Sequence, residues 1–177
     1  RITAPEEPKK SEKEIFRIKR VEIRDMGFVM KNYEFDRHLY DEGGMDWNDL
    51  DVKDINLKAK KLQFKGGIMS GELIGLSCRE KSGYILDNIS GTARVGRGKT
   101  IVEDLEIDDP WSDVNLPLYM MSYENIDAFQ DFIAKVKLDG NISESHLDFK
   151  TLSYFAPELA GNNLKIKISG NMSGYVD

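Results

Sequence analysis

Hydrophobic and polar residues alternate along most of this chain, which is the pattern of β-strands with one solvated face. Leu57 and Ala59 fall on one parity of the alternation, whereas Leu62 and Phe64 fall on the other. A strand can keep its apolar side chains on one face across such a change only if it contains one extra residue that pairs with no residue of the neighbouring strand. We therefore predict a β-bulge or a change of register near Lys60–Lys61.

Short alternating segments recur every 10–14 residues, and residues typical of turns separate them. Examples of such turns are Lys65–Gly67, Lys81–Gly83 and Gly96–Gly98. This spacing predicts consecutive antiparallel strands, about ten or eleven in all. One-sided alternation also favours antiparallel pairing, because parallel strands are usually apolar on both faces.

Two segments depart from the alternation. Residues 124–134 carry apolar side chains at helical spacing and predict a short helix, and residues 151–159 predict a helical turn. Near the start of the chain, we predict strands over 15–23 and 28–33, separated by a turn at Asp25–Gly27.

These elements predict a mainly β fold in which consecutive antiparallel strands form a curled open sheet, a sandwich or a groove, with one or two short helices. Residues 1–14 are rich in Pro, Lys and Glu and predict a flexible tail or linker. Residues 15–177 form the antiparallel β domain, which we expect to be part of a larger protein. A domain of this size favours a closed or partly closed core over an open trough.

The composition excludes several classes of function. The net charge is −6, and the basic runs are interleaved with carboxylates or apolar residues, so we expect no nucleic-acid partner. The longest apolar stretch, Leu116–Met121, is interrupted by Pro117, whereas a membrane-spanning helix needs roughly 20 apolar residues in a row. The single cysteine, Cys78, excludes an internal disulfide and is interpreted as a small buried hydrophobic residue.

No residue pattern indicates catalysis or metal binding. His38 and His146 have no second histidine at the spacing of a zinc site. The acidic residues between Asp46 and Asp54, and between Glu103 and Asp113, do not match a calcium loop and are interpreted as a solvated face. We therefore predict a protein without catalytic residues, metal or cofactor.

The order of several segments resembles AsmA-like and TamB-type proteins of Bacteroidetes. The segments that carry the resemblance are Ile74–Val95, Ile101–Leu116, Leu147–Gly161 and Leu164–Val176, together with the earlier strands from Ile18 to Leu62. The resemblance covers residues 15 to 177. The family has no catalytic residues to transfer to this sequence.

The resemblance implies a non-enzymatic periplasmic segment of a larger protein that an N-terminal helix anchors in the inner membrane. Related proteins form a long, incompletely closed β groove that is proposed to carry phospholipids toward the outer membrane, and TamB is also linked to outer-membrane protein assembly. The implied partners are phospholipid acyl chains and an outer-membrane assembly protein.

A groove of this kind would be lined by the apolar parity of the strands, which could equally form a closed core. The candidate residues for this lining or core are Leu57, Ile74, Leu76, Leu86, Ile89, Leu105, Leu116, Leu118, Leu138 and Ile166. One alternative is a surface adhesion or carbohydrate-binding β-sandwich, in which Trp47, Trp111 and the tyrosines stack on sugars. A second alternative is a hydrolase that uses the acidic clusters.

Overall fold

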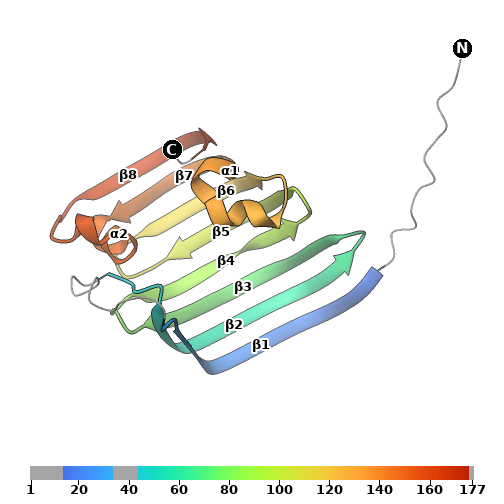
Figure 1. Ribbon diagram of the computed structural model, residues 1–177, viewed down its shortest axis with the longest axis horizontal. Helices are drawn as coiled ribbons and strands as arrows, with labels where there is room; N and C mark the ends of the chain where they lie inside the picture. The colour runs from blue at the N-terminus through green and yellow to red at the C-terminus, as the bar shows by residue number, and fades with distance from the viewer. Residues whose placement is uncertain (1–13, 34–43, 176–177) are drawn as a thin grey trace, which may run out of the picture.

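The computed structural model describes residues 14–33 and 44–175, which form one eight-stranded antiparallel sheet (Figure 1). The strand order in the sheet is the order along the chain, from β1 at one edge to β8 at the other. This confirms the predicted mainly β fold of consecutive antiparallel strands. Except for Glu14, the predicted tail lies outside the described residues, and so does His38.

The eight strands are joined mainly by short turns. Their bounds are β1 Glu14–Lys31, β2 Asp49–Lys65, β3 Ile68–Glu80, β4 Ile85–Val95, β5 Lys99–Asp108, β6 Asp113–Ser122, β7 Lys137–Asp148 and β8 Lys165–Gly174. The predicted turns at Lys65–Gly67, Lys81–Gly83 and Gly96–Gly98 lie where one strand gives way to the next. Glycines 66, 67 and 83 have φ values of 61°, 78° and 97°, which glycine adopts at little steric cost.

The sheet is a single open layer that does not curl over on itself. Of the arrangements that the sequence predicts, the open sheet is the one that forms. No second sheet packs on it within the described ranges, so the expectation of a closed or partly closed core is not met. Each strand contacts mainly the strands beside it in the sheet. Little of the sheet's surface is therefore buried beneath another layer.

The number of strands is eight rather than ten or eleven because some predicted breaks lie inside longer strands. The turn predicted at Asp25–Gly27 is an irregularity within the 18-residue strand β1. Asp25 adopts a φ of 51°, and its backbone N–H donates a hydrogen bond of 3.3 Å to Asn56 Oδ1. A β-bulge absorbs the extra residue there without ending the strand.

The bulge predicted at Lys60–Lys61 is confirmed. Lys61 has a φ of 54°, and the β2–β3 register shifts between Lys60 and Gln63. A similar irregularity occurs at Asp104, with a φ of 51°, where β4 and β5 change register. These bulges keep apolar side chains on one face although their parity in the sequence changes.

Short helical segments lie in two of the connections between strands, β6–β7 and β7–β8. The predicted helix over 124–134 is a 3-10 helix, η2 (Ile126–Asp131), that runs into α1 (Phe132–Lys135), and the predicted turn over 151–159 comprises α2 (Phe149–Phe155) and η3 (Pro157–Leu159). In Figure 1, α1 and α2 lie in front of the β6–β7 part of the sheet, at opposite ends of its strands.

Each helical segment closes a small buried cluster against the sheet. Near α2, the buried residues Met45, Tyr84 and Tyr154 pack with Leu50, Leu86 and Trp111. Near α1, the buried residues Tyr123, Ala128 and Val136 pack with Met121, Phe132 and Leu138. Between these two clusters, no described element covers the sheet.

Candidate functional site

One face of the sheet is apolar across most of its width. Residues that pair across antiparallel strands point to the same face, so the strand register defines the members of this apolar face. One row runs from β1 to β6 and consists of Ile23, Leu57, Leu76, Ile89, Ile107 and Val114. A second row runs from β1 to β7 and consists of Phe16, Phe64, Met69, Val95, Thr100, Met121 and Leu138.

The opposite face carries charged and polar side chains. One row across it consists of Arg20, Lys60, Glu72, Thr92 and Glu103. Lys60 Nζ lies 2.5 Å from a carboxylate oxygen of Glu72, and the guanidinium of Arg94 contacts Glu103. The sheet is therefore amphipathic. Its polar face is suited to contact with solvent, and its apolar face is suited to contact with an apolar ligand or a second layer.

The apolar face is only partly buried. Phe16, Phe28 and Met69 retain 42%, 47% and 51% exposure, although all three are large hydrophobic residues. Soluble monomers rarely leave a contiguous apolar surface of this kind uncovered, and large exposed patches usually mark an interaction site. The apolar face is therefore the strongest candidate for a binding surface.

Most of the predicted lining residues lie on this face. Their positions follow from the register for Leu57, Leu76, Leu86, Ile89, Leu105, Leu116 and Leu138. Ile166 pairs with Leu147 on the edge strand β8 and is 38% exposed.

Leu118 and Ile74 are placed differently from the others. Leu118 pairs with Glu103 and Asn141, which belong to the polar face. Ile74 is passed over in the register between β2 and β3 and is 45% exposed. Both residues follow the sequence alternation, but Ile74 lies at an irregularity of β3, and Leu118 lies beyond the point where β5 bulges at Asp104.

The bulge of β5 also brings Tyr119 onto the apolar face, where sequence parity did not place it. Tyr119 pairs with Val102 and Gly140, and burial raises the pKa of its phenol. Pro117, which cannot donate a ladder hydrogen bond, stands opposite Asp104, between the pairs Leu105–Leu116 and Glu103–Leu118, and is the sequence signal for the change of face. A proline inside an alternating strand would have been reason to restart the parity count at residue 118.

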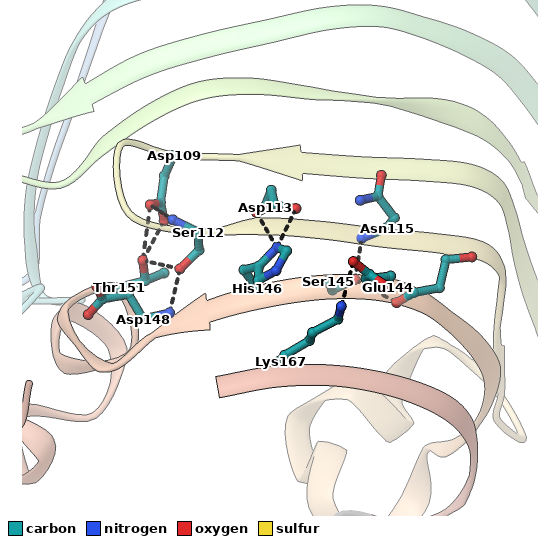
Figure 2. Close-up of polar contacts among 11 residues, drawn as sticks. Asp109, Ser112, Asp113, Asn115, Glu144, Ser145, His146, Asp148, Thr151 and Lys167 are labelled. Carbon is teal, nitrogen blue, oxygen red and sulfur yellow. Dashed lines mark hydrogen bonds and ion pairs between the residues drawn. The ribbon is translucent and has the colours of Figure 1, made fainter. Parts of the chain in front are cut away.

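A polar network joins the turn between β5 and β6 to the start of α2. Figure 2 shows Asp109, Ser112, Asp148 and Thr151 gathered there. Thr151 Oγ1 donates to the Asp109 carboxylate at 2.8 and 3.0 Å, and Ser112 Oγ lies 2.7 Å from Thr151 Oγ1. The Asp148 backbone N–H donates to Ser112 Oγ at 2.9 Å.

These bonds leave neither hydroxyl group available for chemistry. Because the Thr151 hydroxyl donates to Asp109, the Ser112 hydroxyl must donate to Thr151, and each oxygen also accepts a bond. Asp148 caps α2 by accepting from the Lys150 N–H at 2.8 Å, and this bond together with Lys165 lowers the pKa of the Asp148 carboxyl. The network fastens α2 to the sheet, which explains why its side chains are buried and polar.

His146 lies beside this network and pairs with Asp113. Its Nδ1 is 3.0 Å from an Asp113 carboxylate oxygen, and both side chains are about half exposed. The neighbouring Ser145 accepts a hydrogen bond from the Asn115 N–H and donates to the Ser143 carbonyl, each at 2.9 Å. The serine, histidine and aspartate side chains thus do not form a nucleophile–base pair.

The acidic residues are held by separate partners rather than gathered around one ion. Asp46 accepts from the Asn48 N–H at 2.9 Å, and Asp54 lies 3.7 Å from Arg79. A shallow hollow of about 330 Å³ has Glu106 and Glu144 in its lining, but Glu144 is paired with Lys167 at 2.6 Å. Within residues 14–33 and 44–175, no three His, Cys, Asp or Glu side chains are placed to hold a metal ion.

The remaining candidate residues have structural surroundings. Cys78 pairs with Leu86 on the apolar face, and burial raises the pKa of its thiol, which disfavours the reactive thiolate. Trp111 packs against Tyr154, with ring centroids 5.7 Å apart. Trp47 is 52% exposed and lies 6.3 Å from the ring of Phe155, which is 45% exposed.

Comparison with known proteins identifies no relative of this chain, so its function is argued from the geometry described above. No protein-family model, curated protein or solved structure matches the chain. In the part of the chain that the structure describes, no helix combines the length and the apolar character needed to cross a bilayer.

Proposed function

We propose that this chain is a non-enzymatic segment of an AsmA-like or TamB-type cell-envelope protein and that its apolar face binds phospholipid acyl chains. The observation that supports the proposal is the unbroken apolar row across an open, single-layered sheet. The proposal places the segment in the periplasm and its parent protein at the inner membrane, serving phospholipid transport or outer-membrane protein assembly.

The dimensions of the apolar face suit an acyl chain. The row from Ile23 to Val114, whose members belong to neither buried cluster, crosses six strands, and spacings of about 4.8 Å between them give a length of about 24 Å. One acyl chain occupies half of a hydrocarbon core about 30 Å thick. A whole chain can therefore lie along the row, and each methylene removed from water contributes about 0.8 kcal/mol.

This mode of binding accounts for the lack of a recognisable site motif. The hydrophobic effect is non-directional and scales with apolar area, so it needs a continuous surface rather than particular polar groups. The two edge strands, β1 and β8, each have one side unpaired by any described strand. Further strands added at such edges would extend the same surface into a longer groove.

Photo-crosslinking tests the proposal at the level of single side chains. Benzoylphenylalanine is introduced at Leu76 or Ile89 on the apolar face and, as matched controls in the same strands, at Ser77 or Asn88 on the polar face. After irradiation with phospholipid vesicles, mass spectrometry should detect lipid adducts at the first pair alone. Adducts at all four positions, or at none, would contradict the proposal.

A carbohydrate-binding function is the second candidate, because Trp47 and Phe155 form an exposed aromatic pair. Aromatic rings with one open face can stack on sugars, although the sandwich expected for that function is not the observed fold. Calorimetry with oligosaccharides, compared with Trp47→Ala, would test it. Binding that Trp47→Ala abolishes would favour this candidate over lipid binding.

A further inference from the structure

One corner of the sheet brings together residues from the beginning of β1, the end of β2 and the beginning of β3. The register places Phe16 opposite Phe64, and Phe64 opposite Met69. On the alternate positions, Arg17 lies opposite Gln63, and Lys65 lies opposite Ile68. In Figure 1 this corner is at the right of the sheet, where β1 begins and β2 turns into β3.

The corner exposes four large apolar side chains. Ile15 is 67% exposed, Phe16 42%, Ile68 49% and Met69 51%. They surround the Gly66–Gly67 turn at the end of the sheet, where none of the helical segments that the structure describes covers them. An exposed apolar group at the tip of a rigid element can enter a bilayer interface without any change in the fold.

Cationic side chains lie at the same corner, on the face of the sheet opposite to that of Phe16 and Met69. Arg17, Lys19 and Lys61 line a hollow of about 360 Å³ together with Gln63. Glu72 lies next to them and pairs with Lys60 at 2.5 Å and Lys61 at 3.2 Å, and the register places Glu14 opposite Lys65. We name the four cations Arg17, Lys19, Lys61 and Lys65, with the four exposed apolar residues, the basic corner.

This concentration of positive charge contrasts with the net charge of the whole chain, which is −6. Strand β5, for comparison, carries Glu103, Asp104, Glu106 and Asp108 against a single lysine. The sequence alone did not reveal the basic corner, because its cations come from runs about 40 residues apart that β1–β2 pairing brings side by side.

We propose that the basic corner docks on the anionic surface of a phospholipid bilayer. The four cations contact lipid phosphates, and the exposed apolar side chains enter the boundary between headgroups and acyl chains. The apolar side chains favour a bilayer over a nucleic acid, which would offer cations phosphates but leave Ile15 and Ile68 in water. The proposal goes beyond acyl-chain binding on the apolar face and does not depend on it.

Co-sedimentation with vesicles tests the proposal. The chain should bind vesicles that contain phosphatidylglycerol and phosphatidylcholine much more tightly than vesicles of phosphatidylcholine alone. Because each basic side chain near an anionic surface adds about 1 kcal/mol, the combined variant Arg17→Gln, Lys19→Gln and Lys61→Gln should bind on the order of a hundredfold more weakly. Raising the salt concentration should weaken wild-type binding, since it shortens the screening length.

A matched variant removes three exposed lysines elsewhere. Lys53→Gln, Lys165→Gln and Lys167→Gln change the net charge by the same amount at sites outside the basic corner, and this variant should retain nearly wild-type binding. Circular dichroism verifies that both variants keep the β fold. A second variant, Ile15→Ser with Ile68→Ser, should lose at least tenfold in binding with every cation in place.

Three results would overturn the proposal. The first is equal weakening by the two triple variants, which would reduce the effect to net charge. The second is displacement from vesicles by inorganic phosphate beyond that by chloride at equal ionic strength, which would indicate a phosphate-ion site. The third is absence of vesicle binding by the wild-type chain, with or without binding to an RNA oligomer.

Discussion

The hydroxyl group of Thr151 links α2 to the sheet through two elements at once. It donates to Asp109 in the turn after β5 and accepts from Ser112, and the Ser112 oxygen in turn accepts from the backbone of Asp148. Ser112, Thr151 and Asp148 are all buried. Because buried polar groups are costly when unpaired, the network depends on every member being present.

Replacing Thr151 by valine should therefore destabilise the chain although the side-chain shape is nearly kept. Asp109 loses a donor and Ser112 loses an acceptor, so the free energy of unfolding should fall by about 1–3 kcal/mol. Urea denaturation followed by circular dichroism measures this change. The control Thr151→Ser keeps the hydroxyl and should cost less; a valine variant as stable as the serine variant would show that the network contributes nothing.

Glu80 makes the stability of the folded chain depend on pH. It is 6% exposed, and its carboxylate accepts from the backbone N–H groups of Asp51 at 3.2 Å and Ser82 at 2.7 Å. Burial by itself raises the pKa of Glu80, but the hydrogen bonds that it accepts from Ser82 and its neighbours outweigh burial and lower the pKa below the usual 4.5. The charged form is therefore favoured in the folded state.

The stabilisation from Glu80 should be fully present above about pH 4.5, the ordinary pKa of an unfolded glutamate, and should be lost as the pH falls through the lower folded-state pKa. Glu80→Gln should be less stable than wild type at pH 7 and should lose less stability on acidification. Thermal melts from pH 7 to pH 3 measure both curves. Parallel curves would mean that Glu80 is not a source of the acid sensitivity.

At the scale of elements, the strands β6 and β7 approach closely where Gly140 lies. A Cβ atom at this position would stand 2.8 Å from the Leu118 carbonyl oxygen. This contact involves backbone atoms, so it cannot be relieved by rotating a side chain. The close approach lies where Leu118 and Tyr119 pair with Asn141 and Gly140.

Gly140→Ala should force β6 and β7 apart and lower the melting temperature, with a cost of roughly 1–3 kcal/mol, as for other overpacked positions. Gly27→Ala in β1 is the matched control, because the nearest atom to its added Cβ lies 3.8 Å away, an ordinary contact distance. Thermal denaturation of both variants provides the comparison. Equal melting temperatures would contradict the predicted backbone clash.

At the scale of the whole molecule, a single open sheet has two edges and one uncovered apolar face. β1 and β8 each pair with one neighbour, whereas the six inner strands pair with two. Edge strands have fewer hydrogen bonds and open more easily than inner strands. The stability of the chain should therefore decrease from the middle of the sheet toward its edges.

Hydrogen–deuterium exchange should follow this gradient. Peptides from β1 and β8 are expected to exchange first and those from β5 and β6 last, as measured by mass spectrometry. In β1, the amides that point away from β2 should exchange fastest. Protection of these outward amides that grows with protein concentration would instead show that copies pair through this edge, and uniform exchange would contradict the gradient.

The apolar face was only partly predictable because parity is a local property of a strand. Leu57, Leu76 and Ile89 follow the alternation within regular segments, and the register keeps them together. Leu118 and Tyr119 depart from the alternation of Leu116 where the partner strand β5 bulges at Asp104, opposite Pro117. The length of a strand and the position of its bulges depend on the partner strand, which the sequence of one segment does not show.

The sequence by itself determined that the chain folds into consecutive antiparallel strands, that turns lie at Gly66–Gly67, Gly83 and Gly96–Gly98, and that a bulge occurs near Lys61. The reason is that alternation and turn chemistry act over a few residues. Only the tertiary structure decided that the sheet stays open, that helical segments cover just the two ends of its apolar face, and that Arg17 and Lys61 share one corner. These features arise from pairing between segments far apart in the chain. The physical reason is that the two-residue period of a strand determines which of its side chains share a face, whereas long-range packing determines which layer, if any, covers that face.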